Sequence, residues 1–204
     1  MAKKDPSQIQ SATDAQMGQT DAIVVIDKSG SMGDASIRFP TKSKWEELRE
    51  DVSAIAREFA KYDADGLTVI PFSSDASTID GVKPETVSQL FAEHSPRGST
   101  NLAAALQEAL KKAQASQKQA VVLVFTDGSP DDTKAATAIV EQAGKELGRP
   151  RIGFVFVQVG NDRGAAEFLD HLDSNLAVDV CATVAAQDAE NLSVEQLVWL
   201  AQNG

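Results

Sequence analysis

The sequence predicts a three-layer, doubly wound α/β domain whose central sheet is mostly parallel, with one antiparallel edge strand. Short apolar runs recur along the chain, and longer amphipathic segments separate them. The apolar runs lack polar alternation, which indicates strands covered on both faces. Regular alternation of strands with helices requires crossover connections, and these produce parallel strands. A length of 204 residues is enough for one such domain with a real core.

The first half of the chain contains the expected antiparallel strand. Residues 22–26 form the first predicted strand, and apolar side chains at three- and four-residue spacing predict a helix over residues 44–62. Residues 67–72 form the next strand. A tight turn at residues 73–75 then leads into residues 76–79, which we expect to pair antiparallel at the sheet edge.

The second half continues the alternation. Pro84 suits the first turn of a helix, and Asn161 and Asp162 can cap another. The predicted elements are a helix through residues 87–91, a helix over 102–110, a strand over 120–125, a helix over 132–147, a strand over 152–159, a helix over 165–172, a short strand over 176–181 and a helix over 193–201.

The first 20 residues are rich in Gln, Ser, Asp and Thr and have no apolar periodicity, so we expect a flexible leader over 1–20 and the domain over 21–204. No apolar segment typical of a secretory signal is visible, and the longest apolar run, residues 120–125, is too short to span a membrane. Cys181 is the only cysteine, which excludes an intramolecular disulfide. These features favour a cytoplasmic protein.

The net charge is −11, from 19 basic and 30 acidic residues. Because phosphate-rich surfaces attract basic proteins, this balance argues against nucleic acid and against an anionic membrane as partners. No long exposed apolar stripe is predicted, so we expect a monomer.

Three oxygen-bearing side chains stand where the first strand ends. Asp27, Ser29 and Ser31 occupy alternate positions directly after the apolar run. A carboxylate and two hydroxyls are hard oxygen donors, which suit Mg²⁺ and are poor ligands for zinc or copper.

Two later loops offer matching donors. Thr100 stands just before a predicted helix, and Asp127 follows the third buried strand by one residue. Since the carboxyl ends of parallel strands meet at one edge of a sheet, both residues are expected near Asp27.

This pattern resembles the metal-ion-dependent adhesion site of the von Willebrand factor A family: D-x-S-x-S at Asp27, Ser29 and Ser31, then a distant Thr at Thr100 and a distant Asp at Asp127. The resemblance covers about residues 20–200. It implies Mg²⁺, with Mn²⁺ as a substitute, bound directly by Ser29, Ser31 and Thr100 and through water by the two aspartates. It also implies a protein partner that presents a Glu or Asp to the ion, because hydroxyl ligands leave the ion most of its charge.

Two finer expectations follow from the same resemblance. The residues expected to form the partner-binding rim around the ion are Met32, Asp34, Ser99, Asn101 and Ser129. Residues 152–162 followed by 165–175 resemble the A domains associated with bacterial tellurite-resistance and stress operons.

Enzymatic alternatives fit less well, and we therefore expect a protein that is not an enzyme. A serine hydrolase using Ser31 needs a glycine at the position of Ser29, and only His94 and His171 are available as a base. A Mg²⁺-dependent phosphohydrolase using Asp27 needs a second Asp at that same position.

Two further hypotheses concern which metal, if any, the site holds. A Ca²⁺ loop beginning at Asp27 places Arg38 where a Glu is required. A metal-free scaffold stays open as an alternative, because Asp and Ser side chains also cap loops and turns.

Overall fold

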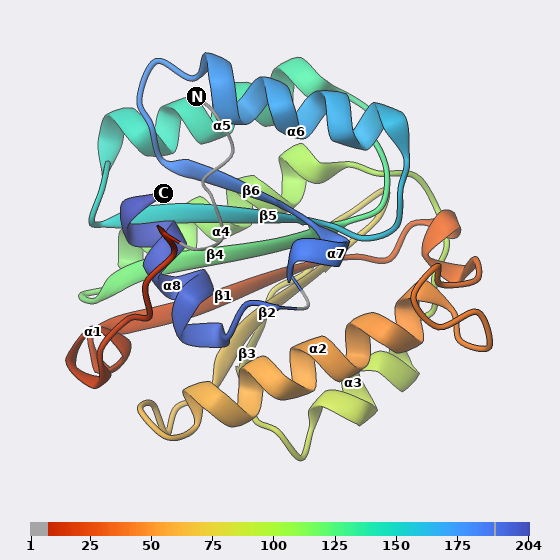
Figure 1. The fold of residues 1–204 in the computed structure, drawn as a ribbon, viewed down its shortest axis with the longest axis horizontal. Coiled ribbons are helices and arrows are strands. Elements are labelled where there is room, and N and C mark those ends of the chain that lie inside the picture. The colour runs from red at the N-terminus through yellow and green to blue at the C-terminus, as the bar shows by residue number, and fades with distance from the viewer. Residues whose placement is uncertain (1–7, 190) are drawn as a thin grey trace.

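A six-stranded sheet in the order β3-β2-β1-β4-β5-β6 forms the centre of the computed structural model, which describes residues 8–189 and 191–204. The strands are β1 Thr20–Asp27, β2 Leu67–Phe72, β3 Ile79–Val82, β4 Gln119–Thr126, β5 Ile152–Gln158 and β6 Cys181–Ala185. β3 runs antiparallel to β2, whereas the other neighbouring pairs are parallel. Helices cover both faces (Figure 1). The predicted fold class is therefore confirmed.

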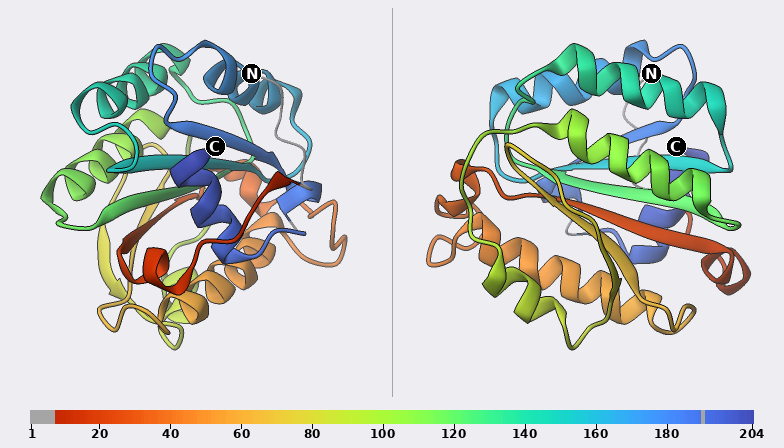
Figure 2. Two further views of the ribbon diagram at one scale, coloured as in Figure 1. Left: turned by 60° about the vertical axis from the view of Figure 1, so that its left-hand side comes forward. Right: turned by 180° about the vertical axis from the view of Figure 1, so that it is seen from behind.

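The helices are α1 Asp14–Gly18, the 3-10 helix η2 Gly30–Gly33, α2 Lys44–Phe59, α3 Val87–Glu93, α4 Leu102–Ala115, α5 Thr133–Glu146, α6 Arg163–Asn175, α7 Ala186–Ala189 and α8 Val194–Asn203. Helices α2, α3 and α8 pack on one face of the sheet, and α4, α5 and α6 pack on the other (Figure 2). Each face holds its own apolar cluster.

Strand β1 shows why its sequence is apolar throughout. Val24 and Ile26 belong to the apolar cluster under α2, whereas Ile23 and Val25 belong to the cluster under α4. Because successive side chains of a strand point to opposite faces, a strand covered on both sides needs apolar residues at every position.

Both predicted sheet edges differ from the observed ones. Residues 76–79 were expected to form the antiparallel strand, but Ala76 makes only an isolated bridge to Phe72, and β3 starts at Ile79. A shift in the β2–β3 register accompanies this later start. At the other edge, residues 176–181 were expected to form the last strand. Val178 instead packs against Gly144 of α5, and β6 begins at Cys181.

The expected flexible leader also differs from the structure. Within the described part, Thr13 caps α1 through a capping box, and Met17 is fully buried. The backbone N–H of Ala12 donates to the carbonyl of Glu195 in α8, at 3.0 Å. Residues 8–20 are therefore attached to the domain, residues 1–7 lie outside the described residues, and the division of the chain at residue 21 stays a prediction.

The parallel strands end at a common edge of the sheet, which we call the carboxyl edge. The segments that leave β1, β2, β4 and β5 at this edge begin at Lys28, Ser73, Asp127 and Val159. This arrangement brings together loops separated by up to 130 residues. Among the helices that the structure describes, none is both long and apolar enough to cross a membrane.

Candidate functional site

Asp27 ends β1 and is fully buried. Its Oδ1 atom accepts a hydrogen bond from the backbone N–H of Ser29 at 2.7 Å, and its Oδ2 atom accepts one from Thr126 Oγ1 at 2.7 Å. Burial raises the pKa of Asp27 to about 6, although these hydrogen bonds oppose the increase, and the nearby charge of Asp127 adds to it. A carboxyl group held this way is fixed in position and easily protonated in the metal-free protein.

Ser29 and Ser31 connect Asp27 to the loop after β4. Ser29 is the N-cap residue of the 3-10 helix η2, and its hydroxyl lies 3.2 Å from the hydroxyl of Ser31. Ser31 Oγ donates to Asp127 Oδ1 at 2.9 Å. The structure thus joins four of the five predicted ligands, Asp27, Ser29, Ser31 and Asp127, in one hydrogen-bonded group. We call these four residues the edge cluster.

Thr100, the fifth predicted ligand, is placed beside the edge cluster by backbone contacts. Its N–H donates to Asp131 Oδ1 at 3.1 Å, and its carbonyl accepts from the N–H of Asp131 at 3.0 Å. The same loop reaches the β1 segment, since the carbonyl of Gly98 accepts from the N–H of Gly30 at 3.2 Å. The Thr100 loop therefore contacts both segments that carry the edge cluster.

A glycine and a helix cap fix this loop. Gly98 has a φ of +85°, and a Cβ atom there would lie 2.8 Å from the hydroxyl of Ser74, so any other residue would be strained. Asn101 accepts from the N–H of Ala104 at the start of α4, and its own N–H donates to the carbonyl of Ser73 at 2.7 Å. Thr100 thus stands between two anchored positions.

Lys44 also reaches the edge cluster, a contact that was not predicted from the sequence. Its Nζ atom donates to Asp127 Oδ2 at 2.7 Å and to the carbonyl of Ser31 at 3.3 Å. The side chain of Lys44 is 15% exposed, and that of Asp127 is fully buried. The signal that could have revealed it is a lysine at the first position of a helix, where the helix dipole disfavours a cation.

Thr126 and Asp131 are two further residues that the sequence analysis did not single out. Thr126 donates to Asp27, and Asp131 positions Thr100. Thr126 ends β4, and Asp131 lies in the loop that follows. The oxygen donors around Asp127 were the available signal, but polar residues at strand ends and in loops are too common for that signal to be specific.

The predicted partner-binding rim is corrected at one position. Met32 is fully buried and belongs to the apolar cluster under α2, because the 3-10 helix turns its side chain inward. It therefore offers no contact surface. Asp34, Ser99 and Ser129 are exposed, and Asn101 is half-buried, so these four remain available to a partner.

The composition of the edge cluster fits a hard cation. Among the described residues, no group of three or more His, Cys, Asp or Glu side chains is arranged to hold a metal. The edge cluster differs from such a group, since it combines two buried carboxylates with hydroxyls. Ser31 is exposed, so the cluster is open to solvent on that side. Two buried carboxylates compensated by one lysine leave a negative charge that a small cation would neutralise.

Among the described residues, neither histidine hydrogen bonds to Ser31, as a serine hydrolase would require. A ring nitrogen of His94 lies 2.8 Å from the carbonyl of Leu90, and His171 contacts Asn175 on α6. The hydroxyl of Ser31 donates to Asp127, whose other oxygen is bound by Lys44. This arrangement does not match a serine–histidine pair.

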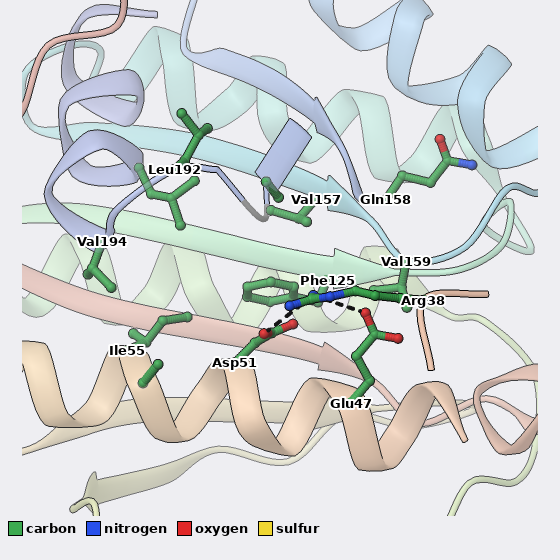
Figure 3. Close-up of a pocket in the computed structure, with 13 residues that line it drawn as sticks. Arg38, Glu47, Asp51, Ile55, Phe125, Val157, Gln158, Val159, Leu192 and Val194 are labelled. Carbon is green, nitrogen blue, oxygen red and sulfur yellow. Dashed lines mark hydrogen bonds and ion pairs between the residues drawn. The ribbon is translucent and has the colours of Figure 1, made fainter. Parts of the chain in front are cut away.

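A separate pocket of about 230 Å³ lies on the α2 face of the sheet (Figure 3). Its wall is mainly apolar. At its polar end, Arg38 contacts Glu47 at 3.1 Å and Asp51 at 3.8 Å. The residues that line it are Arg38, Glu47, Asp51, Ala54, Ile55, Phe125, Val157, Gln158, Val159, Ala189, Leu192, Val194 and Leu197. None of these belongs to the edge cluster, so the two features are distinct.

Comparison with known proteins gives one family match. The family model described as the von Willebrand factor type A domain matches residues 21–196. No curated protein sequence matches the chain closely enough to count as a relative.

Solved structures resemble the fold at low sequence identity. The PilB minor pilin from Streptococcus sanguinis has a TM-score of 0.59 at 15% identity, over 95% of this chain and 60% of that one. A von Willebrand factor type A protein from Catenulispora acidiphila has a TM-score of 0.64 at 16% identity, over 88% of this chain and 42% of that one. The manganese-loaded Plasmodium vivax TRAP protein has a TM-score of 0.63 at 16% identity, over 89% of this chain and 74% of that one. These likenesses show the fold alone, and the chain spans only about 60% of the pilin's length.

Proposed function

Because the chain belongs to the von Willebrand factor type A domain family, we propose that it is a binding module that recognises another protein through a divalent cation at the carboxyl edge of its sheet. Domains of this family are generally protein-interaction modules and often depend on a metal. The proposal for this chain adds the ion, the residues that hold it and the chemistry of the partner.

In the proposed site, Ser29, Ser31 and Thr100 bind the ion directly, and Asp27 and Asp127 hold it through water. The ion is Mg²⁺ or Mn²⁺. A manganese-loaded relative in fold, the TRAP protein, supports Mn²⁺ as a candidate. The bound ion supplies an electrophilic position that a partner carboxylate can fill.

One observation carries this proposal: two fully buried carboxylate side chains, from β1 and from the loop after β4, are joined at a solvent-open edge. The connection runs through the backbone N–H and hydroxyl of Ser29 and the hydroxyl of Ser31. Holding a carboxylate out of water costs free energy unless a cation or hydrogen bonds compensate it. Here burial outweighs the hydrogen bonds, as the raised pKa of Asp27 indicates. A site that holds a cation accounts for this arrangement better than loop capping does.

The partner in this proposal is a protein that presents a Glu or Asp, rather than a nucleic acid or a membrane. The chain acts as a monomeric, cytoplasmic module without catalytic activity. A role in bacterial stress response rests on the resemblance of residues 152–162 and 165–175 to the tellurite-resistance group.

The first experiment is calorimetric titration of Mg²⁺ and of Mn²⁺ into metal-stripped protein. We expect saturable binding at one site, and we expect Asp27→Ala to abolish it and Thr100→Ala to weaken it. Circular dichroism of both variants checks that the fold is retained, since both positions lie in loops or at a strand end.

Failure of both ions to bind the wild-type protein, together with an empty site after soaking crystals in concentrated Mg²⁺, would contradict the proposal. The domain would then be a metal-free scaffold. Binding to a partner that is unchanged by a chelator would lead to the same conclusion.

A further inference from the structure

Lys44 occupies a position that local helix energetics disfavour. It is the first residue of α2, directly after the N-cap Ser43, and the first turn also contains Glu46 and Glu47. The helix dipole places partial positive charge at this end, so acidic residues stabilise it and a lysine destabilises it. The two glutamates follow that rule and Lys44 does not. Tertiary contacts must therefore account for a lysine at this position.

Those contacts hold the ammonium group at the edge cluster. Nζ lies 2.7 Å from Asp127 Oδ2 and 3.3 Å from the carbonyl of Ser31. Asp127 receives the hydroxyl of Ser31 on its other oxygen. The Lys44 ammonium group thus contacts the side chain of one predicted metal ligand, Asp127, and the backbone carbonyl of another, Ser31.

Neighbouring residues leave room for the Lys44 side chain along its path to Asp127. A Cβ atom placed on Gly160, which follows β5, would lie 3.3 Å from Lys44 Cε, so the absence of a side chain at that position leaves room for the lysine. The backbone N–H of Lys44 is also fixed, because it donates to the carbonyl of Asp34 at 2.9 Å. Lys44 is therefore held at both ends, by its backbone N–H and by its ammonium group.

The neighbouring lysine is directed elsewhere. Lys28, next to Asp27 in the chain, donates to Ser73 Oγ at 2.8 Å and lies 3.8 Å from Asp75. Lys44 is the lysine in contact with the edge cluster. With Asp27 and Asp127 ionised, the cluster and Lys44 together carry a net charge of about −1, which a divalent ion converts to about +1.

We propose that Lys44 is a tethered cation that competes with the divalent ion for Asp127, so that it weakens metal binding and leaves the loaded site positively charged for an acidic partner. This inference rests on the proposed function. Without Lys44, the loaded site would be neutral, and its attraction for a carboxylate would be weaker. Lys44 thus lowers the affinity of the site for the ion and raises the affinity of the loaded site for an acidic partner.

The test is titration of Mn²⁺ and of Mg²⁺ into metal-stripped wild-type protein and into the Lys44→Met variant, which keeps an unbranched side chain of similar length and removes the charge. We expect the variant to bind the ion about tenfold more tightly or better, because a like charge close to the ion has been removed. Lys44→Arg keeps the charge and should stay close to the wild type.

Lys42→Met is the matched control. Lys42 lies two residues earlier in the chain, and its Nζ pairs with Glu50 at 2.6 Å on the surface. Lys42→Met removes the same charge near the same helix end, but among the described residues Lys42 makes no contact with the edge cluster. Its metal affinity should therefore equal that of the wild type within about twofold, as expected for exposed charges. A gain shared by both variants would show only a general charge effect and would overturn the proposal.

A second readout is the thermal unfolding of the metal-free protein. Lys44→Met should lower the melting temperature, because Asp127 loses its buried partner, and Mn²⁺ should raise it more in the variant than in the wild type. Lys44→Gln, which can still donate a hydrogen bond, provides a second variant in case the methionine does not fold.

The outcomes separate this inference from the proposed function. Wild-type binding with equal or weaker binding by Lys44→Met would overturn the role of Lys44 and leave the metal site standing. Binding by the variant but not by the wild type would support the inference in its strongest form, with Lys44 replacing the ion. No binding by either, together with an empty site after soaking crystals in concentrated Mg²⁺, would overturn both.

Discussion

The two ends of the central sheet use the same kinds of charged residues in opposite ways. At the carboxyl edge, Asp27 and Asp127 are at most 2% exposed. At the amino end, Asp63 pairs with Lys118 at 2.6 Å and Asp80 pairs with Lys112 at 2.5 Å, around an open hollow of about 630 Å³. The carboxylates of Asp27 and Asp127 are enclosed by protein, whereas the side chains of Asp63 and Asp80 are 15% and 60% exposed.

The pKa values move in opposite directions at the two ends. Burial raises the pKa of Asp27 to about 6. Partial burial also acts to raise the pKa of Asp63, but hydrogen bonds from Lys118 and from the backbone of Asp65 outweigh it and lower the pKa below its usual value. The hydrogen bond from Lys112 likewise lowers the pKa of Asp80.

This difference shows which end is a candidate site. Each carboxylate at the amino end already has a lysine partner and needs no ligand, and the exposed Asp80–Lys112 pair contributes little to stability. A buried carboxylate with a raised pKa reduces the stability of the metal-free fold, and such groups are concentrated at functional sites. The following predictions test this contrast in order of expected effect.

The largest expected effect is on the pH dependence of stability. The unfolded chain has Asp27 at its usual pKa of 3.8, whereas the folded metal-free protein has it at about 6, so the fold binds the proton more tightly. The stabilisation is fully present below about pH 4 and is lost as the pH rises through about 6, a change of about 3 kcal/mol.

Denaturant unfolding of the wild type and Asp27→Asn from pH 4 to pH 7.5, without metal, measures this change. We expect the wild type to lose between about 2 and 3 kcal/mol relative to the variant over this range, since the last part of the change lies below pH 4. A constant difference between the two proteins would show that the pKa of Asp27 is not raised by the fold.

The next effect is on metal affinity. We expect Asp27→Asn to weaken Mn²⁺ binding by about 10- to 100-fold, because an amide is a poorer acceptor for metal-bound water and cannot balance the charge of the ion. Calorimetry measures the change, with Asp80→Asn at the amino end as the control that should bind like the wild type. Equal losses in the two variants would remove the distinction between the two ends.

Proton competition should also weaken metal binding in acid. Since Asp27 must be ionised to hold a metal-bound water, the apparent affinity for Mn²⁺ should fall about tenfold per pH unit below about 6. Calorimetric titrations at pH 7.5, 6 and 5 check this slope. An affinity that does not vary over this range would show that Asp27 does not contribute to binding.

The smallest effect is expected at the amino end. Asp80→Asn removes an ion pair whose carboxylate side chain is 60% exposed, so it should change the free energy of unfolding by less than about 1 kcal/mol. The change should become smaller still in 1 M salt, where exposed charges are screened. A loss above 2 kcal/mol would indicate that this pair has a structural role.

Much of the fold was predictable because it depends on local patterns. The strands at residues 22–26 and 120–125 were placed within two residues of their observed bounds, since apolar runs of this kind suit only a covered strand. The edges of the sheet were less predictable. The apolar residue Val178 has the composition of a strand residue, but it packs on α5 and the strand begins later, at Cys181.

The composition of the candidate site followed from sequence, and its connections did not. Polar residues after Ile26 and Phe125, together with the parallel topology, predicted that Asp27 and Asp127 would lie at one edge. Nothing in the sequence revealed that Ser31 would donate to Asp127 or that Met32, the next residue, would be buried. The first depends on how the segment after β1 meets the loop after β4, and the second depends on how the 3-10 helix packs on the apolar cluster under α2.

The sequence by itself determined the alternation of strands and helices and the chemical types of the residues at the strand ends, because hydrophobic periodicity and loop composition are local properties. Only the tertiary structure decided which side chains meet. The contact of Lys44 with Asp127 spans 83 residues, and that of Thr126 with Asp27 spans 99. Such contacts depend on strand register and helix packing, which the whole chain fixes together.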